Sequence, residues 1–170
     1  MNQLRIALTV VALLALAAAA VAGPATGAAK RPSTSADVVD VKVVPAGLMA
    51  KPGAEVAFTV HMDIADTWHL YDHQYAEDPE SFFIGVDLMP GEGANLAGFA
   101  ADFPVGEPGT FMGDKVVMLH HQAAIMVKVT LPEDAFGTVD VPLVLTAQAC
   151  DDKLCLQPSD IPVTVSIEVQ

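Results

Sequence analysis

Apolar and polar residues alternate with a period of two along most of the chain after residue 37, the pattern of strands with one buried face. The clearest alternating runs are 56–62, 125–129, 139–147 and 163–169. Turn-forming residues separate such runs, at 51–53, 90–93, 107–109 and 157–159. No stretch beyond residue 22 has the 3.6-residue stripe of a sustained amphipathic helix.

This pattern predicts an all-β domain over residues 37–170. About seven to nine short strands, each with one buried face, would form two packed antiparallel sheets. The preceding residues 23–36, GPATGAAKRPSTSA, are Gly, Pro, Ser, Thr and Ala with two basic residues. We expect them to be a flexible linker.

Residues 1–22 read as a secretory signal peptide. Arg5 is the single positive charge of the N-terminal region, and an apolar Ala- and Leu-rich run follows it. Ala20-Val21-Ala22 is a small-x-small cleavage pattern. The run is short for a bilayer span, although an uncleaved N-terminal anchor is the alternative. We therefore expect a periplasmic or otherwise exported protein, soluble and without stable membrane insertion after cleavage.

The composition is strongly acidic, with a formal net charge of −13. Cleavage after residue 22 would leave 148 residues and a charge of −14, because the removed segment carries one Arg and no acid. Such a chain would repel phosphates, so we expect no nucleic-acid partner. Neither a cofactor motif nor a Ser/His/Asp order is visible, so no cofactor and no independently acting enzyme is predicted.

Cys150 and Cys155 are the only two cysteines, and an oxidising compartment would allow them to pair. A disulfide that closes a six-residue ring contributes only about 2 kcal/mol as a staple. The spacing alone leaves a redox role and a structural role open. Asp151 and Asp152 would disfavour a thiolate nearby, with Lys153 offsetting only part of this. If the pair is redox-active, we expect its oxidised form to receive electrons from a more nucleophilic partner.

Three stretches carry a family resemblance. They are Asp66-Thr67-Trp68-His69-Leu70-Tyr71, then Phe103-Pro104 through Phe111-Met112-Gly113-Asp114-Lys115, and Gln148-x-Cys150-x4-Cys155-x2-Pro158. They resemble, in turn, an early strand, the loop that caps the active disulfide and the redox signature of the N-terminal domain of the DsbD thiol:disulfide interchange protein. The resemblance covers roughly residues 38–169 and implies an immunoglobulin-like antiparallel β-sandwich.

The resemblance also implies a function and a site. The chain would pass electrons from a thioredoxin-like or membrane-bound thiol reductase to oxidised exported proteins, as a component of protein-disulfide reduction. Cys150 and Cys155 would be the exchanging pair, with Cys155 entering mixed disulfides. Phe111 would be the cap, and Tyr71 and His69 would line the site.

Two departures from the family pattern stand out. The membrane-spanning and thioredoxin-like portions of the full reductase are not in this sequence, so the electron donor would be a separate protein. Gly109 and Thr110 precede Phe111 where an acidic residue is often found, with Glu107 further back. This puts in doubt any tuning of the thiol pKa by an acid at that position.

Two other classes of function compete with the redox carrier. One is copper binding in an exported protein, through soft thioether and imidazole ligands from His61, Met118, His120 and Met126. Met62 and His121 belong to the same group, but neighbouring His120 and His121 would point to opposite faces of a strand. The other is an immunoglobulin-like binding module whose disulfide is only structural.

Overall fold

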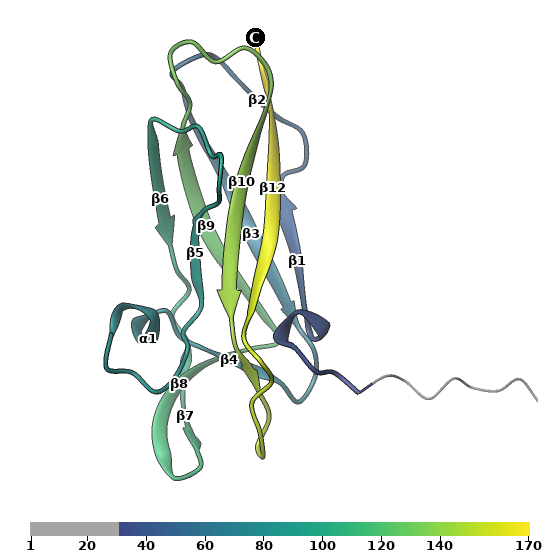
Figure 1. Ribbon diagram of the computed structural model, residues 1–170, viewed down its shortest axis with the longest axis vertical. Helices are drawn as coiled ribbons and strands as arrows, with labels where there is room; N and C mark the ends of the chain where they lie inside the picture. Colours follow the sequence, from purple (N-terminus) through teal and green to yellow (C-terminus); the bar gives the residue numbers. More distant parts are fainter. Residues whose placement is uncertain (1–30) are drawn as a thin grey trace, which may run out of the picture. The chain divides into compact units, whose positions relative to one another are not determined.

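The structure is a computed structural model that describes residues 31–170, which form twelve strands and two short helical segments (Figure 1). The expected signal peptide, residues 1–22, and most of the expected linker lie outside these residues. Within residues 31–170, no helix combines the length and apolar character needed to cross a membrane.

The first sheet of the sandwich has the antiparallel order β1-β3-β9-β6. Its strands are β1 Val39–Val44, β3 Glu55–Ile64, β9 Gln122–Thr130 and β6 Gly98–Asp102. In β3 the burial alternates as predicted, because Val56, Phe58, Val60 and Met62 are all buried. Period-two alternation thus places one face of the sheet against the core.

The second sheet has the order β2-β12-β10-β5, and only its β2–β12 pair is parallel. Its strands are β2 Leu48–Ala50, β12 Ser159–Val169, β10 Gly137–Ala147 and β5 Asp87–Pro90. Opposing pairs such as Val141 with Val165 and Leu143 with Val163 are buried in the core shared with the first sheet. The all-β, immunoglobulin-like sandwich predicted from the sequence is confirmed.

A third, smaller sheet lies at one end of the sandwich, beyond the ends of β10 and β12 (Figure 1). Its order is β11-β4-β8-β7, with β11 Ala149–Cys150, β4 His69–Tyr71, β8 Asp114–His120 and β7 Glu107–Phe111. We call it the end sheet. The turn predicted at 107–109 is wrong, because these residues belong to β7. Pro108 is accommodated there because β7 is an edge strand.

The two faces of the end sheet have different surroundings, because successive side chains along each strand point to opposite faces. Ala149 pairs with Leu70, which pairs with Leu119, and all three belong to the core of the sandwich. The residues on the opposite face, among them Cys150 and Tyr71, form a separate cluster. One face thus anchors the end sheet and the other is available for a site.

The domain begins earlier than predicted. A 3-10 helix, η1 Ser35–Asp37, stands where the flexible linker was expected to continue to residue 36. The Ser35 side chain is fully buried, and its hydroxyl donates to the Gln157 carbonyl at 2.9 Å and accepts from the Ala149 N–H at 2.8 Å. A small hydroxyl satisfies two backbone groups here, so this part of the expected linker is packed.

Candidate functional site

The disulfide between Cys150 and Cys155 is formed, as the sequence predicted for an oxidising compartment. Strand β11 delivers Cys150 immediately after β10, and the chain returns through an antiparallel bridge at Cys155, with the two Cα atoms 4.0 Å apart. The Asp151 carboxylate accepts hydrogen bonds of 2.8 Å from the Lys153 and Leu154 backbone N–H groups. Asp151 therefore shapes the loop between the cysteines.

The two cysteines differ in their access to solvent. Cys150 is fully buried, whereas Cys155 is exposed. A protein thiol approaching from solvent therefore meets the Cys155 side of the bond first. The role that the family resemblance gives to Cys155, entry into mixed disulfides, stays a prediction.

Cys150 belongs to a buried group that we call the disulfide cluster: Tyr71, Phe111, Val116, Met118 and Cys150. Phe111 lies at the tip of the β7–β8 hairpin, where Met112 and Gly113 have the positive φ angles of a tight two-residue turn. The Phe111 side chain is only 8% exposed although it sits at a hairpin tip. The hairpin thus folds an aromatic ring over the buried half of the disulfide.

Aromatic rings surround this cluster on several sides. The ring of Tyr71 lies 4.5 Å from that of Phe83 and 6.1 Å from that of Phe111. The His69 ring lies 5.8 Å from Phe111 and 5.4 Å from Tyr71, both in edge-on arrangements. The three residues that the sequence analysis named as cap and lining, Phe111, Tyr71 and His69, are thus brought together beside Cys150.

Two further residues of the site were missed from the sequence. Tyr75 and Phe83 pack against the disulfide cluster, and the Tyr75 hydroxyl accepts a 2.9 Å hydrogen bond from the Val117 N–H. Tyr75 comes from the short helix α1 Gln74–Glu77, and Phe83 from the loop that leads on to β5. Neither segment has an alternating pattern. The sequence therefore offered only one signal for these two site residues, namely that they are aromatic, with Tyr75 close to Tyr71 and Phe83 close to Pro79.

Burial is the main influence on the ionisation of His69 and Tyr71. It lowers the pKa of His69, as does the nearby His120, while Asp152 and Asp151 act in the opposite direction. Burial also raises the pKa of the Tyr71 hydroxyl to about 12, with Tyr75 adding to the effect. Both side chains are therefore neutral at pH 7. Two backbone hydrogen bonds hold the pKa of Asp151 below its ordinary value.

Two buried polar atoms beside the disulfide lack a hydrogen-bond partner within residues 31–170. They are Nε2 of His69 and the hydroxyl oxygen of Tyr71. Their residues are 5% and 0% exposed. Buried polar atoms without partners are rare and carry a free-energy cost, so their presence here marks the site as more than ordinary core.

The residues of the copper hypothesis are divided between two sheets, with His61 and Met126 in the first sheet and Met118 and His120 in the end sheet. His61 and Met126 are exposed on the outer face of the first sheet, whereas Met118 is buried in the disulfide cluster. His120 is on β8, beside His69. Among residues 31–170, no three His, Cys, Asp or Glu side chains are grouped so as to hold a metal ion.

Gly109, next to the cap, lies in β7 opposite Val116, and a Cβ atom there would meet the terminal methyl of Met118. Because that methyl is the far end of a flexible side chain, Met118 could move aside, and sterics alone do not explain the departure from the family pattern.

Solved structures resemble this chain at low sequence identity. The N-terminal periplasmic domain of ScsB from Proteus mirabilis aligns with a TM-score of 0.55 and 11% identity, covering 78% of this chain and 47% of that one. The DsbD N-terminal domain of Neisseria meningitidis in its reduced form aligns with a TM-score of 0.45 and 24% identity, covering 68% and 80%. The ScsB likeness supports the fold. Curated protein sequences give no match.

A family model settles the relationship. The model of the N-terminal region of the thiol:disulfide interchange protein DsbD matches residues 36–166, which is most of the chain and includes the whole disulfide cluster. The family fits the thiol–disulfide chemistry that the paired cysteines allow. The chain therefore belongs to the family of DsbD N-terminal domains.

Proposed function

We propose that this protein is an exported redox carrier that passes two electrons through Cys150 and Cys155. The observation that carries the proposal is the asymmetry of the bond, since Cys155 is exposed and Cys150 is buried under Phe111. A structural staple needs no such arrangement. A carrier needs one sulfur that partners can reach and one that they cannot.

The exchange proceeds in two steps. The thiolate of a donor protein attacks Sγ of Cys155, the Cys155–Cys150 bond breaks, and Cys150 leaves with the electron pair. A second donor thiol then resolves the mixed disulfide, so the donor leaves oxidised and both cysteines are reduced. Delivery to an oxidised exported protein runs in the opposite order, with Cys155 as the attacking sulfur and Cys150 as the resolving one.

Phe111 would control which thiols reach the bond. Its ring covers the buried side of the disulfide from a short hairpin, and a partner could displace it by moving only the hairpin tip. Small thiols, which bind nothing on the surface, would not displace it efficiently. This gating would keep the carrier from reacting with every thiol in its compartment.

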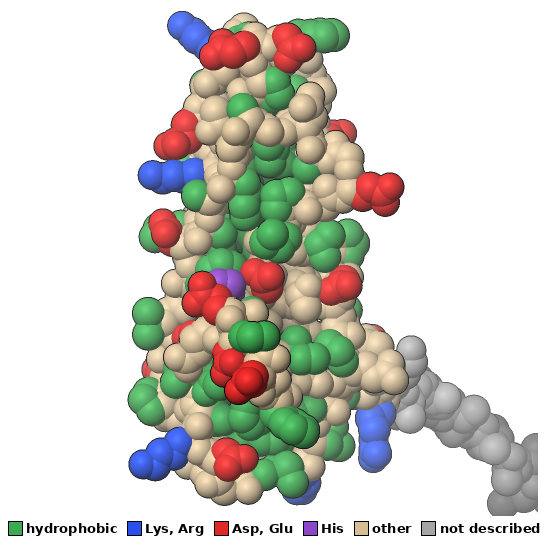
Figure 2. Space-filling view, turned by 60° about the vertical axis from the view of Figure 1, so that its left-hand side comes forward, with side chains coloured by type: hydrophobic (Ala, Val, Ile, Leu, Met, Phe, Trp, Pro, Cys, Tyr) green, Lys and Arg blue, Asp and Glu red, His purple; other side chains and the backbone are tan. Residues whose placement is uncertain are grey.

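Exposed apolar residues next to the site support docking of a protein partner. Phe82, Met112 and Leu154 are 98%, 81% and 48% exposed, and they adjoin Phe83, Phe111 and Cys155 in sequence. Figure 2 shows hydrophobic side chains gathered over the lower part of its face, with acidic side chains among them. We infer a thioredoxin-like or membrane-bound thiol reductase as the donor and oxidised exported proteins as acceptors, in the periplasm or an equivalent compartment.

Trapping of mixed disulfides tests the proposal. In Cys150→Ala, Cys155 stays free and no internal thiol can resolve its mixed disulfides. Adducts with redox partners should therefore accumulate in the compartment to which the protein is exported. The matched control is Cys155→Ala, in which the remaining Cys150 is buried and should trap little.

The reduction potential provides an independent test. A carrier should equilibrate with mild dithiols while folded, at a potential above the approximately −300 mV that is typical of structural disulfides. The cap can slow small thiols but does not change the equilibrium, so a bond that stays closed to dithiothreitol after long incubation, in the folded wild type and in folded Phe111→Ala alike, would exclude the carrier function.

A further inference from the structure

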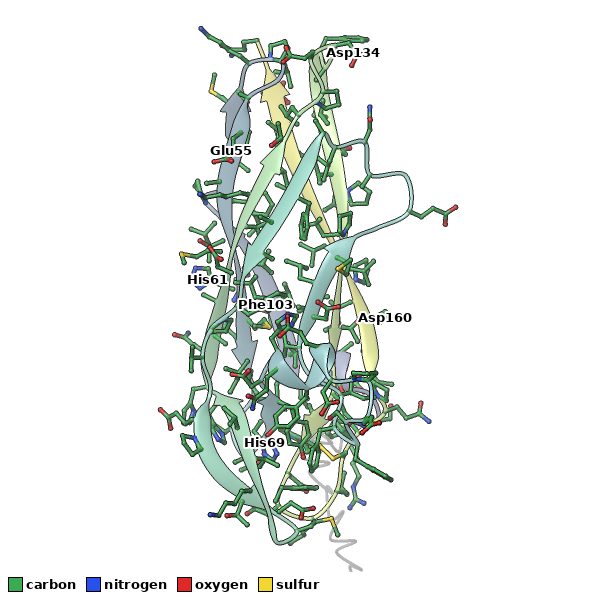
Figure 3. The ribbon with its side chains drawn as sticks, turned by 90° about the vertical axis from the view of Figure 1, so that its left-hand side faces the viewer. Glu55, His61, His69, Phe103, Asp134 and Asp160 are labelled. Carbon is green, nitrogen blue, oxygen red and sulfur yellow. A yellow bond between two sulfur atoms is a disulfide. The ribbon has the colours of Figure 1, made fainter. Side chains whose placement is uncertain are left out.

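Cys150, His69 and His120 form a row across three neighbouring strands of the end sheet. His69 is the direct cross-strand partner of Cys150 on one side and of His120 on the other. Direct partners share one face of a sheet, with Cβ atoms about 4.5–5.5 Å apart. The two imidazole rings are 5.7 Å apart, and in Figure 3 His69 lies beside the disulfide.

The protonation state of the buried Cys150 has to change during exchange. When the bond opens, the sulfur of Cys150 receives the electron pair among Tyr71, Phe111 and Met118, where water cannot stabilise a thiolate. Desolvation raises the pKa of such a thiol. Asp151 and Asp152 follow Cys150 directly, and their charges act in the same direction. Cys150 must therefore gain a proton on opening and lose it again before the bond can close.

His69 has the properties of the missing proton partner. Its ring is 5% exposed, and its Nε2 atom has no hydrogen-bond partner among residues 31–170. Burial and His120 lower the pKa of the imidazole more than Asp152 and Asp151 raise it. A neutral imidazole can accept a proton at pH 7. Tyr71, also unpartnered, is a poor substitute because the pKa of its hydroxyl is about 12.

We propose that His69 exchanges the proton of the Cys150 thiol during thiol–disulfide exchange, and that His120 links it to solvent. The inference rests on the proposed redox function and assigns a residue to its buried half-reaction. In the closing direction, His69 takes the proton from the Cys150 thiol, and the resulting thiolate attacks Sγ of Cys155. The new S–S bond forms as the bond to the acceptor sulfur breaks, and the acceptor leaves as a thiolate.

The opening direction is the reverse of these steps. Cys150 leaves as a thiolate, and a protonated His69 returns the proton to give the neutral thiol. His120 is only partly buried and lines a surface groove with Pro104 and Gln122, so it can pass protons between His69 and water. No acid–base group other than the two imidazoles is needed.

Reaction of the reduced protein with excess 5,5′-dithiobis(2-nitrobenzoic acid) separates the two cysteines. Attack by Cys155 releases the first nitrothiobenzoate in a phase whose rate is proportional to reagent concentration. Closure by Cys150 releases the second in a phase independent of that concentration. The reduced protein is prepared by reduction in denaturant and refolding, so that the measurement does not depend on any physiological donor.

His69→Gln should slow the second phase by about 100-fold at pH 7, the range of a lost general base, and leave the first phase unchanged. The rate constant of the second phase of the variant should then rise about tenfold per pH unit, because it depends on the Cys150 thiolate alone. In the wild type the rate constant of the same phase should not change between pH 7 and 8. The matched control, His61→Gln, changes an exposed histidine on β3 and should behave as the wild type.

An unchanged second phase in His69→Gln would overturn the inference, and so would equal slowing of both phases, which indicates a merely structural effect. If the variant does not fold, the wild-type profile decides, because a tenfold rise per pH unit from pH 7 to 8 is incompatible with His69 as the acceptor. The proposed function fails differently, through an oxidised protein that mild dithiols cannot reduce while the second phase of the refolded protein remains fast.

Discussion

Two tyrosines of the site bury similar rings but differ in their hydrogen bonding. The Tyr75 hydroxyl accepts from the Val117 N–H at 2.9 Å, whereas the Tyr71 hydroxyl is buried without a partner in the described part of the chain. Tyr75→Phe should cost about 1 kcal/mol, because it leaves a backbone N–H unpaired. Tyr71→Phe should cost nothing or be slightly stabilising. Urea unfolding at pH 7 measures both, and an equal loss in the two variants would contradict the difference.

Phe111 is the residue whose truncation should separate stability from reactivity. Phe111→Ala removes a ring that is 8% exposed and opens a cavity over Cys150, which should lower the free energy of unfolding by about 3 kcal/mol. It should also speed reduction of the disulfide by dithiothreitol by about tenfold, because small thiols then reach the bond. Phe136→Ala is the control, because Phe136 is 86% exposed. Equal reduction rates in the two variants would show that Phe111 does not shield the bond.

At the scale of elements, long strands were predictable and short ones were not. Strands β3, β9, β10 and β12 contain 9–11 residues each, enough for the alternation to stand out. Strands β4 and β11 have 3 and 2 residues, and every residue in them is buried, so they carry no period-two signal. The sequence therefore predicted the sandwich and missed the end sheet that builds the site.

The site was predictable only in part, for a related reason. The cysteine pair stood out from the sequence itself, whereas Phe111, Tyr71 and His69 were found through the resemblance to a family, which carries positions as well as residue types. Tyr75 and Phe83 reach the cluster from a one-turn helix and a loop, whose paths depend on tertiary packing. The position of His69 opposite Cys150 follows from the pairing of β4 with β11, which no local pattern reveals.

The hydrogen bonds of Asp37 at the η1 segment should make the free energy of unfolding depend on pH in the acid range. The Asp37 carboxylate accepts hydrogen bonds from the Ser33 and Thr34 N–H groups at 2.8 and 3.0 Å, which lowers its pKa to about 2. Since the folded-state pKa lies below the unfolded value, the stabilisation is complete above about pH 4 and is lost as the pH falls towards 2. Asp37→Asn should remove this part of the pH dependence.

Urea unfolding between pH 5 and pH 2 tests this prediction. The matched control is Asp134→Asn, at an exposed position in the turn before β10. If the difference between wild type and Asp37→Asn stays constant over this pH range, the carboxylate does not support the segment.

At the scale of the whole described domain, the core and the site are built on opposite faces of one sheet. Leu70, Leu119 and Ala149 secure the end sheet to the core of the sandwich, while Tyr71, Met118 and Cys150 face the other way. The neighbours in sequence thus alternate between holding the fold and forming the site. Opening and closing of the disulfide, as proposed above, would therefore place no direct demand on the residues that hold the sandwich together.

This separation predicts a local response to loss of the disulfide. The double variant Cys150→Ala/Cys155→Ala should remain folded and lose about 2 kcal/mol, the contribution expected from closing a six-residue ring. Amide hydrogen exchange should accelerate at 107–118 and 149–156, where the cap hairpin and the cysteine loop lose their shared cluster, and stay unchanged in β3, β9, β10 and β12. Accelerated exchange throughout the four long strands would mean that the bond supports the core, and the division between scaffold and redox site would not hold.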